Sequence, residues 1–215
     1  IIQNIHIQDP KISSKFFNFV IVPEHDNIVS GDNVLISKGA LHYLNTEEVE
    51  NTNFKNENII SLILGGPNKY YSFLFKDLEN IFIQLLKLKN ITKINVIGSR
   101  RTPPHLFEKL RSVFKDKKFN YDFSLQKINY TKSLSEASHI FITCDSTSMI
   151  SEAAITGKPI YTIKLKNIKN DYRFQRFFKL FQELGIIRFF DGSIDNWTYE
   201  KLYESKRISN NIIKK

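Results

Sequence analysis

The sequence predicts an α/β fold, in which an open parallel sheet is covered by helices on both faces. Short β-branched runs alternate with longer runs whose apolar residues recur at helical spacing, an order typical of parallel strands joined by crossover helices. Most of the strand candidates are apolar throughout rather than alternating. This pattern is expected for strands that are covered on both sides.

The short runs predict six strands, at residues 17–22, 59–64, 93–98, 122–125, 139–143 and 159–164. The longer runs predict five helices, at residues 71–89, 104–114, 133–137, 146–156 and 172–184. Pro104 suits the first turn of its helix, because the N–H that proline lacks has no partner there. The helix that ends at Thr156 is followed by Gly157 and Pro159, a common stop signal.

The chain divides into two parts of unequal size. Residues 51–215 are expected to form the open α/β domain, and residues 1–50 the remnant and linker of a preceding α/β domain. The stretch 46–58 is polar and predicts a linker or a peripheral helix between the two. Because the chain begins with Ile1, in strand-like sequence, we expect that an upstream part of the protein is missing.

The composition excludes several classes of protein. With 25% charged and 13% aromatic residues among 215, the chain can build a core, so wholly disordered readings are excluded. A single cysteine rules out a disulfide framework and suits a reducing compartment such as the cytoplasm. No run reaches the roughly 18 apolar residues of a membrane-spanning helix.

The net charge of +9 comes mostly from lysine, in a chain rich in isoleucine and asparagine. The lysines do not interleave with aromatic residues as a stacking groove for nucleic acid would require. We therefore expect no nucleic-acid partner. A basic face for anionic ligands or for an anionic membrane surface remains open, beside plain solubilisation.

The loops at the carboxyl ends of the strands are the expected ligand site of an open parallel sheet. The first such loop contains Gly65, Gly66 and Asn68. Paired glycines let a backbone approach a ligand closely, and the amides of the next helix point to the same place. An ordinary Gly-Gly-Pro turn is the alternative.

The second loop places Ser99, Arg100, Arg101 and Thr102 at a strand end, just before a helix that starts with proline. Two adjacent arginines at such a position are natural partners for a phosphate group.

The third loop carries the most polar groups. Ser146 can cap a helix whose first amides and hydroxyls form an anion site, and Glu152 lies one turn beyond Ser148, where it can accept hydrogen bonds from a ribose. A capped helix with a solvated glutamate is the alternative. The candidate binding residues here are Asp145, Ser146, Thr147, Ser148, Met149, Ser151 and Glu152.

Several chemical signatures are absent. The sequence contains no G-x-G-x-x-G, no phosphate-binding P-loop motif, no H-E-x-x-H, no paired C-x-x-C and no D-x-D. The usual sequence motifs therefore do not indicate dinucleotide redox chemistry, P-loop hydrolysis, a structural zinc site or a metal site built on an acidic triplet. We expect no metal and no cofactor.

The series IVPEHD, SKGALHYL, LILGGPNKYY, SRRTPP, TCDSTSMISEAAITGKPIY and WTYEKLYES resembles the mitochondrial-fission "elongated mitochondria" family, and the match covers roughly the last two-thirds of such proteins. That family is similar to GT-B glycosyltransferases, so the resemblance implies a GT-B-like, Rossmann-like sheet. This sequence departs from the family's pattern at two places. Asn129 and Tyr130 are adjacent, without the usual proline between them, and Cys144 stands in place of a small apolar residue.

The third loop is similar to the nucleotide-sugar segment of lipid-linked N-acetylglucosaminyltransferases. By that resemblance Gly65 and Gly66 would face a diphosphate, and Glu152 would hold the ribose. The implied activity is metal-independent transfer of the sugar from a nucleoside-diphosphate sugar to an unknown acceptor, which is either soluble or associated with a membrane. A non-catalytic scaffold that recruits a protein partner, as the plant member is regarded to do, is the alternative.

Two further features bear on function. His25, followed by Asp26, comes after the first predicted strand and is a candidate general base near a cleft; a polar loop anchor is the alternative. The helix 172–184 is amphipathic, and its aromatic face predicts packing on the sheet or, alternatively, a peripheral membrane contact. That face consists of Phe174, Phe177, Phe178, Phe181 and Leu184.

Overall fold

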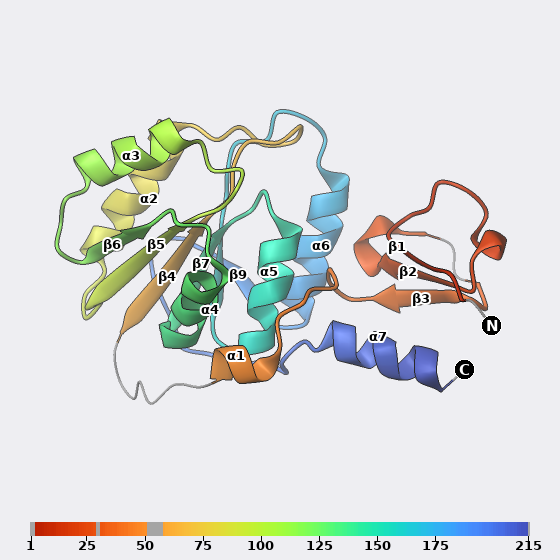
Figure 1. Cartoon of the computed structure of the whole chain (residues 1–215). Coiled ribbons are helices and arrows are strands. Elements are labelled where there is room, and N and C mark those ends of the chain that lie inside the picture. The colour runs from red at the N-terminus through yellow and green to blue at the C-terminus, as the bar shows by residue number, and fades with distance from the viewer. Residues whose placement is uncertain (1–2, 29–30, 51–57, 215) are drawn as a thin grey trace.

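A computed structural model describes residues 3–28, 31–50 and 58–214 (Figure 1). Two parallel sheets are present in this part of the chain, one of six strands and one of three. The larger has the order β6-β5-β4-β7-β8-β9. Its strands are β4 (Ile59–Leu64), β5 (Lys93–Gly98), β6 (Phe119–Asp122), β7 (His139–Thr143), β8 (Ile160–Ile163) and β9 (Ile187–Phe189).

Helices cover both faces of the six-stranded sheet, with α2 and α3 on one face and α4 and α5 on the other (Figure 1). These helices are α2 (Phe75–Lys87), α3 (Pro104–Val113), α4 (Lys127–Glu136) and α5 (Thr147–Ala153), followed along the chain by α6 (Tyr172–Glu183). All six residues of β4 are buried, as are Phe82, Phe107 and Phe141. The predicted α/β class with an open parallel sheet is confirmed.

The chain order of the strands creates one reversal. From β4 the chain runs outward through β5 to β6, and α4 then carries it back to β7 on the other side of β4. The carboxyl ends of β4 and β7 therefore flank a topological switch point, where open α/β sheets bind their ligands.

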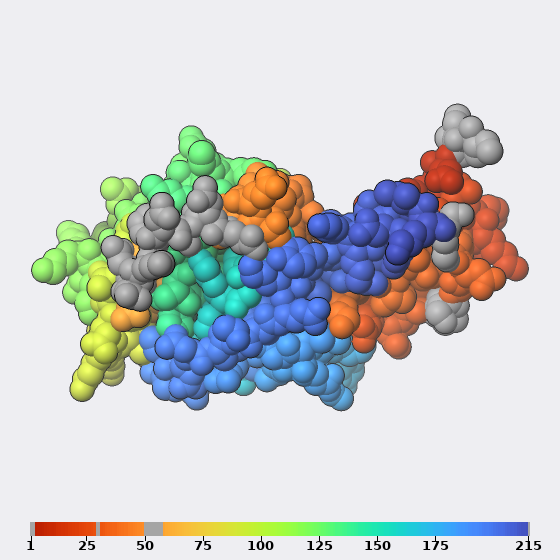
Figure 2. All heavy atoms as spheres, turned by 90° about the horizontal axis from the view of Figure 1, so that it is seen from below, coloured from red at the N-terminus to blue at the C-terminus, as the bar shows by residue number. Residues whose placement is uncertain are grey.

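The smaller sheet has the order β1-β2-β3 and consists of β1 (Ile5–Ile7), β2 (Phe19–Pro23) and β3 (Val34–Ser37). It is covered in part by α7 (Glu204–Ile213), from the far end of the sequence, whose Ile208 packs with Phe19, Ile21 and Leu35. Figure 2 shows α7, in dark blue, lying against the orange N-terminal segments. The sequence pattern does not predict β1, β3, β9 or α7, three of which are strands of only three or four residues.

The predicted strand 122–125 is wrong. The strand is β6, Phe119–Asp122, and it stops there because the Asp122 carboxylate accepts a hydrogen bond from the Ser124 amide at 2.7 Å, a turn that competes with the sheet. Leu125 then adopts a left-handed backbone, with φ of 59°. Residues 123–126 thus form a loop between β6 and α4.

Two helix boundaries also differ from expectation. The helix predicted at 71–89 begins at Phe75, because residues before it are extended and Tyr71 pairs with Asn167 in an antiparallel bridge. The helix predicted at 133–137 spans Lys127–Glu136. Part of the predicted linker, Thr46–Glu50, forms the short helix α1, and residues 51–57 lie outside the described part.

The aromatic face of α6 is packed inside the protein. Phe174, Phe177, Phe178 and Phe181 are all buried, with exposures of 7% or less. The membrane contact considered for this face is therefore wrong, and its packing on the protein core is confirmed. Among the residues that the structure describes, no helix has the combined length and hydrophobicity needed to traverse a bilayer.

Candidate functional site

A cavity of about 590 Å³ opens at the carboxyl edge of the six-stranded sheet, next to the switch point. Its volume is in the range of small-molecule sites, roughly 300–1,000 Å³. Residues from the second and third predicted loops line it, and the first loop does not, although β5, β4 and β7 are neighbours in the sheet and end at the same edge. The predicted residues that line it are Ser99, Arg100, Arg101, Ser146, Ser148, Met149 and Glu152.

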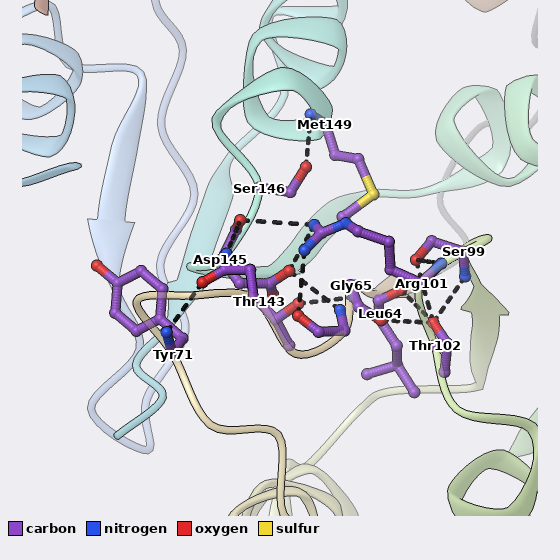
Figure 3. A network of polar contacts seen from close by, with 12 residues as sticks. Leu64, Gly65, Tyr71, Ser99, Arg101, Thr102, Thr143, Asp145, Ser146 and Met149 are labelled. Atoms are coloured by element: carbon purple, nitrogen blue, oxygen red, sulfur yellow. Dashed lines mark hydrogen bonds and ion pairs between the residues drawn. The ribbon is translucent and has the colours of Figure 1, made fainter. Parts of the chain in front are cut away.

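The two adjacent arginines have different surroundings. Arg101 donates a hydrogen bond to the Gly66 carbonyl at 3.1 Å and an ion-paired one to the Asp145 carboxylate at 2.6 Å (Figure 3). It thereby joins the loops that follow β4 and β7. Arg100 is exposed, and among the described residues it has no hydrogen bond or ion pair. Arg100 is thus the guanidinium available to a ligand.

Asp145 is the buried end of this connection, with 3% of its surface exposed. Oδ2 accepts from the Gly66 amide at 3.0 Å as well as from Arg101, whereas Oδ1 has no hydrogen-bond partner among the described residues. Burial raises the pKa of Asp145, against the hydrogen bonds and the Arg101 charge, which lower it. The Asp145 carboxylate therefore links the loops after β4 and β5 to the end of β7, and its ionised form is stabilised by Arg101.

The paired glycines are explained by the same centre. A Cβ on Gly65 would lie 2.2 Å from Asp145 Oδ2, and a Cβ on Gly66 would lie 1.9 Å from the Arg101 carbonyl oxygen. Both are buried, and neither lines the cavity. The close approach that paired glycine permits is made here to protein atoms.

Other predicted residues also serve the loops themselves. Thr102 Oγ1 lies 2.6 Å from the Gly65 carbonyl and accepts from the Ser99 amide at 2.8 Å. Asn68 accepts from the Tyr71 amide at 2.9 Å and donates to the Asp145 carbonyl. These contacts hold the three loops together beneath the cavity.

Helix α5 forms one wall of the cavity. Ser146 caps it, accepting from the Met149 amide at 3.4 Å, and Ser148 is exposed on its first turn. Ser151, which does not line the cavity, is buried; it donates to the Thr147 carbonyl and accepts from the Ala40 amide at 3.0 Å. Ser151 therefore ties α5 to the segment that follows the small sheet.

Glu152 lies in the cavity wall one turn further along α5. Its Oε2 accepts a hydrogen bond from the Tyr130 hydroxyl at 2.9 Å. Burial raises the pKa of Glu152, and the Tyr130 hydrogen bond and the Arg100 charge oppose that rise. Among the described residues Tyr130 engages only one carboxylate oxygen, so the other can accept from a ligand hydroxyl.

The opposite wall was missed by sequence reasoning. It comes from the β6–α4 loop and the start of α4, together with Tyr43, over whose ring the Lys127 ammonium lies at 4.7 Å. Because a strand was predicted at 122–125, the loop was not considered as part of the site. The adjacent Asn129 and Tyr130 were the sequence feature that could have pointed to this wall. The additional polar or aromatic lining residues are Tyr43, Asp122, Ser124, Gln126, Lys127, Asn129 and Tyr130.

His25 lies in a different place, a second cavity of about 110 Å³ between the small sheet and α5, which Thr147 and Ser148 also line. The ring is 2% exposed, and neither nitrogen has a hydrogen-bond partner among the described residues. It packs edge-on against Phe177 at 5.1 Å. Burial, with Arg173 and Arg176 nearby, lowers the pKa of His25 to about 4 although Asp26 opposes the shift.

The described residues contain no group of three or more histidine, cysteine or carboxylate side chains that could hold a metal ion. The only cysteine, Cys144, is buried, and its sulfur accepts from the Leu165 amide at 3.2 Å. Burial raises the pKa of this thiol to about 12, so it remains protonated and unreactive at neutral pH.

Solved structures share the fold. MurG from Acinetobacter baumannii matches with a TM-score of 0.52 and 14% identity, over 92% of this chain and 53% of that one. UDP-GlcNAc 2-epimerase from Neisseria meningitidis, determined with UDP-GlcNAc bound, matches with a TM-score of 0.51 and 12% identity, over 94% of this chain and 63% of that one. The GT-B-like architecture is thereby confirmed.

Two curated proteins are similar in sequence. An uncharacterized protein of Rickettsia prowazekii is 32% identical over 158 residues, covering 69% of this chain and 44% of the relative. The mitochondrial fission protein ELM1 of Arabidopsis thaliana is 24% identical over 245 residues, covering 97% of this chain and 56% of the relative. The chain thus spans about half the length of these relatives. A family model described as Mitochondrial fission ELM1 matches residues 2–215, and the chain belongs to that family.

Proposed function

We propose that this chain is the nucleotide-sugar-binding half of a glycosyltransferase-like protein. The observation that carries the proposal is a cavity of ligand size at the switch point, with an unpaired arginine, two serines at a helix start and a half-engaged glutamate in its walls. The GT-B fold and the UDP-GlcNAc that the Neisseria meningitidis epimerase holds support the same class of ligand.

The lining residues divide into two regions that suit the two ends of such a ligand. Arg100, Ser146 and Ser148 would bind the phosphates, since a guanidinium and hydroxyls make charge-assisted hydrogen bonds to phosphate oxygens. Glu152, held by Tyr130, would accept from the ribose hydroxyls. The nucleobase would then extend toward the 123–126 loop and Tyr43.

Transfer by this site would depend on electrostatic stabilisation of the leaving group. As the sugar–phosphate bond breaks, negative charge develops on the diphosphate, and Arg100 with the neighbouring hydroxyls would offset it. The proposed chemistry uses no metal and no cofactor; the sugar nucleotide is the substrate. The acceptor and any general base would come from outside this cavity.

A protein-recruiting role without catalysis is the second candidate. It is favoured by the lack of an evident general base in the cavity. Among the described lining residues there is no histidine, and the carboxylates of Asp122 and Glu152 both accept hydrogen bonds from protein groups. The name of the Arabidopsis relative, a mitochondrial fission protein, also fits such a role.

Calorimetric titration with UDP-GlcNAc and with other UDP-, GDP-, CMP- and ADP-sugars tests the first candidate. We expect binding by one nucleotide class and a loss of about 10- to 100-fold in Arg100→Ala, the range for a hydrogen bond to a charged group. Glu152→Gln should weaken binding as well. Arg111→Ala, which removes an exposed arginine on α3, is the matched control and should bind as the wild type does.

Two outcomes would contradict the proposal: no binding of any sugar nucleotide by the full-length protein, or affinities unchanged in both Arg100→Ala and Glu152→Gln. If a protein partner is also captured equally by wild type and by both variants, the recruiting role is the better account.

A further inference from the structure

Two segments at the carboxyl edge of the large sheet are joined into one surface, which we call the lysine ledge: residues 69–76, from the β4–α2 loop into the first turn of α2, and residues 164–172, from the β8–α6 loop to the first residue of α6. The Ser72 amide donates to the Lys166 carbonyl at 3.0 Å, and the Ile168 amide donates to the Tyr70 carbonyl at 2.8 Å. Figure 1 shows the two loops running side by side above the sheet. They behave as a short two-stranded ribbon.

The ledge is supported from beneath. The buried Tyr71 hydroxyl donates to the Asp171 carboxylate at 2.5 Å, and Asp171 also accepts from Gln175 at 2.7 Å. The rings of Tyr70 and Tyr71 pack on Phe174 at 5.3 and 5.1 Å. The loops are therefore held in place by α6.

The exposed side chains of the ledge are largely apolar or basic. Three large side chains are more than half exposed: Leu74 at 53%, Ile168 at 56% and Tyr172 at 64%. Asp171 is the only carboxylate in the two segments, both fully described, and it is buried. The exposed cations are Lys69, Lys76, Lys164, Lys166 and Lys169.

These lysines are not neutralised by the protein. Lys69 and Lys164 lie over the rings of Tyr70 and Phe189, contacts that leave their charge in place. Among the described residues, Lys76, Lys166 and Lys169 form no ion pair. Five exposed lysines on two joined segments, without an ion pair among the described residues, are complementary to a polyanionic surface.

We propose that the lysine ledge binds an anionic lipid surface. Exposed aliphatic side chains beside lysines suit the boundary between headgroups and acyl chains. A nucleic-acid groove needs several exposed aromatic rings for stacking, and in the two segments only the Tyr172 ring is more than half exposed. The ledge follows β4 and β8, so it shares the sheet edge of the cavity. Bound in this way, the site would face the membrane. The inference does not depend on nucleotide binding.

Sedimentation with vesicles tests the ledge. The protein should bind vesicles of 70% phosphatidylcholine and 30% phosphatidylserine, and not pure phosphatidylcholine. Each lysine near such a surface contributes about fivefold in affinity, so Lys166→Gln/Lys169→Gln should bind on the order of 25-fold more weakly. Ile168→Ser should weaken binding at unchanged charge.

The matched control is Lys115→Gln/Lys117→Gln, which removes the same charge from the loop before β6, at the opposite edge of the sheet. It should bind within about twofold of wild type, and thermal unfolding checks that all variants are folded. Equal weakening by the two double variants would overturn the proposal, as would a lack of binding to the anionic vesicles. If the protein binds an RNA more tightly than the anionic vesicles, and Ile168→Ser does not change the affinity for that RNA, the ledge would be assigned to nucleic acid instead.

Discussion

Replacing Arg101 by methionine should destabilise the protein, whereas the same change at Arg100 should not. Arg101→Met leaves the Asp145 carboxylate, whose side chain is 0% exposed, with the Gly66 amide as its remaining hydrogen-bond donor within the described part of the chain. Removing one partner from a fully buried ion pair costs about 3–5 kcal/mol, and an exposed pair is worth less than about 1 kcal/mol.

The expected loss lies between these limits, because the Arg101 side chain is 40% exposed and water can reach the space it vacates. We expect the free energy of unfolding to fall by about 2 kcal/mol in Arg101→Met. Arg100→Met removes an exposed charge that forms no hydrogen bond or ion pair with the described residues, and it should stay within about 0.5 kcal/mol of wild type.

Urea unfolding at pH 7 followed by circular dichroism measures both values. Adding Asp145→Asn to Arg101→Met should recover part of the loss, since a neutral amide is less costly to bury than a lone carboxylate. The deficit of Arg101→Met should also shrink as the pH falls, because protonation neutralises the carboxyl that has lost its partner. Equal destabilisation by Arg100→Met, or no recovery in the double variant, would refute the reasoning.

Three further predictions concern packing and protonation. Gly65→Ala should cost more than about 3 kcal/mol, because its Cβ would overlap Asp145 Oδ2; Gly31→Ala, with its nearest neighbour at 3.5 Å, should cost less than about 1 kcal/mol in the same urea assay. His25 has its pKa lowered from 6.5 to about 4, so the unfolded chain takes up the proton first and stability falls between these pH values. His25→Gln should remove up to about 3 kcal/mol of that fall in acid titrations. Phe177→Ala should lower stability by about 3–5 kcal/mol in thermal unfolding, since the ring is fully buried.

Sequence reasoning located the strands that are buried on both faces. β4, β5 and β7 lie at the predicted residues, because continuous apolar runs leave little freedom in where such a strand begins and ends. It also placed the polar loops after these strands, since the residues that end a strand are local features. Short edge strands such as β6 have only one neighbour, so their pattern is weaker and the prediction slipped.

The division of work within the loops could not be read from the sequence. Arg100 and Arg101 are adjacent and chemically identical, yet Arg100 forms no ion pair with the described residues, whereas Arg101 is held by Asp145, 44 residues away. Gly65 and Gly66 predict a close approach, and only the folded chain shows that the approaching groups are Asp145 and Arg101. The residues that line the far wall, including Tyr43 and Tyr130, depend on which helix packs beside α5.

The sequence by itself therefore determined the class of fold, the identity of the buried strands and the loops that carry polar groups. The tertiary structure alone decided which polar groups support the loops, which face the cavity, and that the lysine ledge and α7 join distant segments. Local pattern reports the environment of each residue along one element. Which residues from distant segments contact one another depends on the order of the strands in the sheet. Long-range packing determines that order.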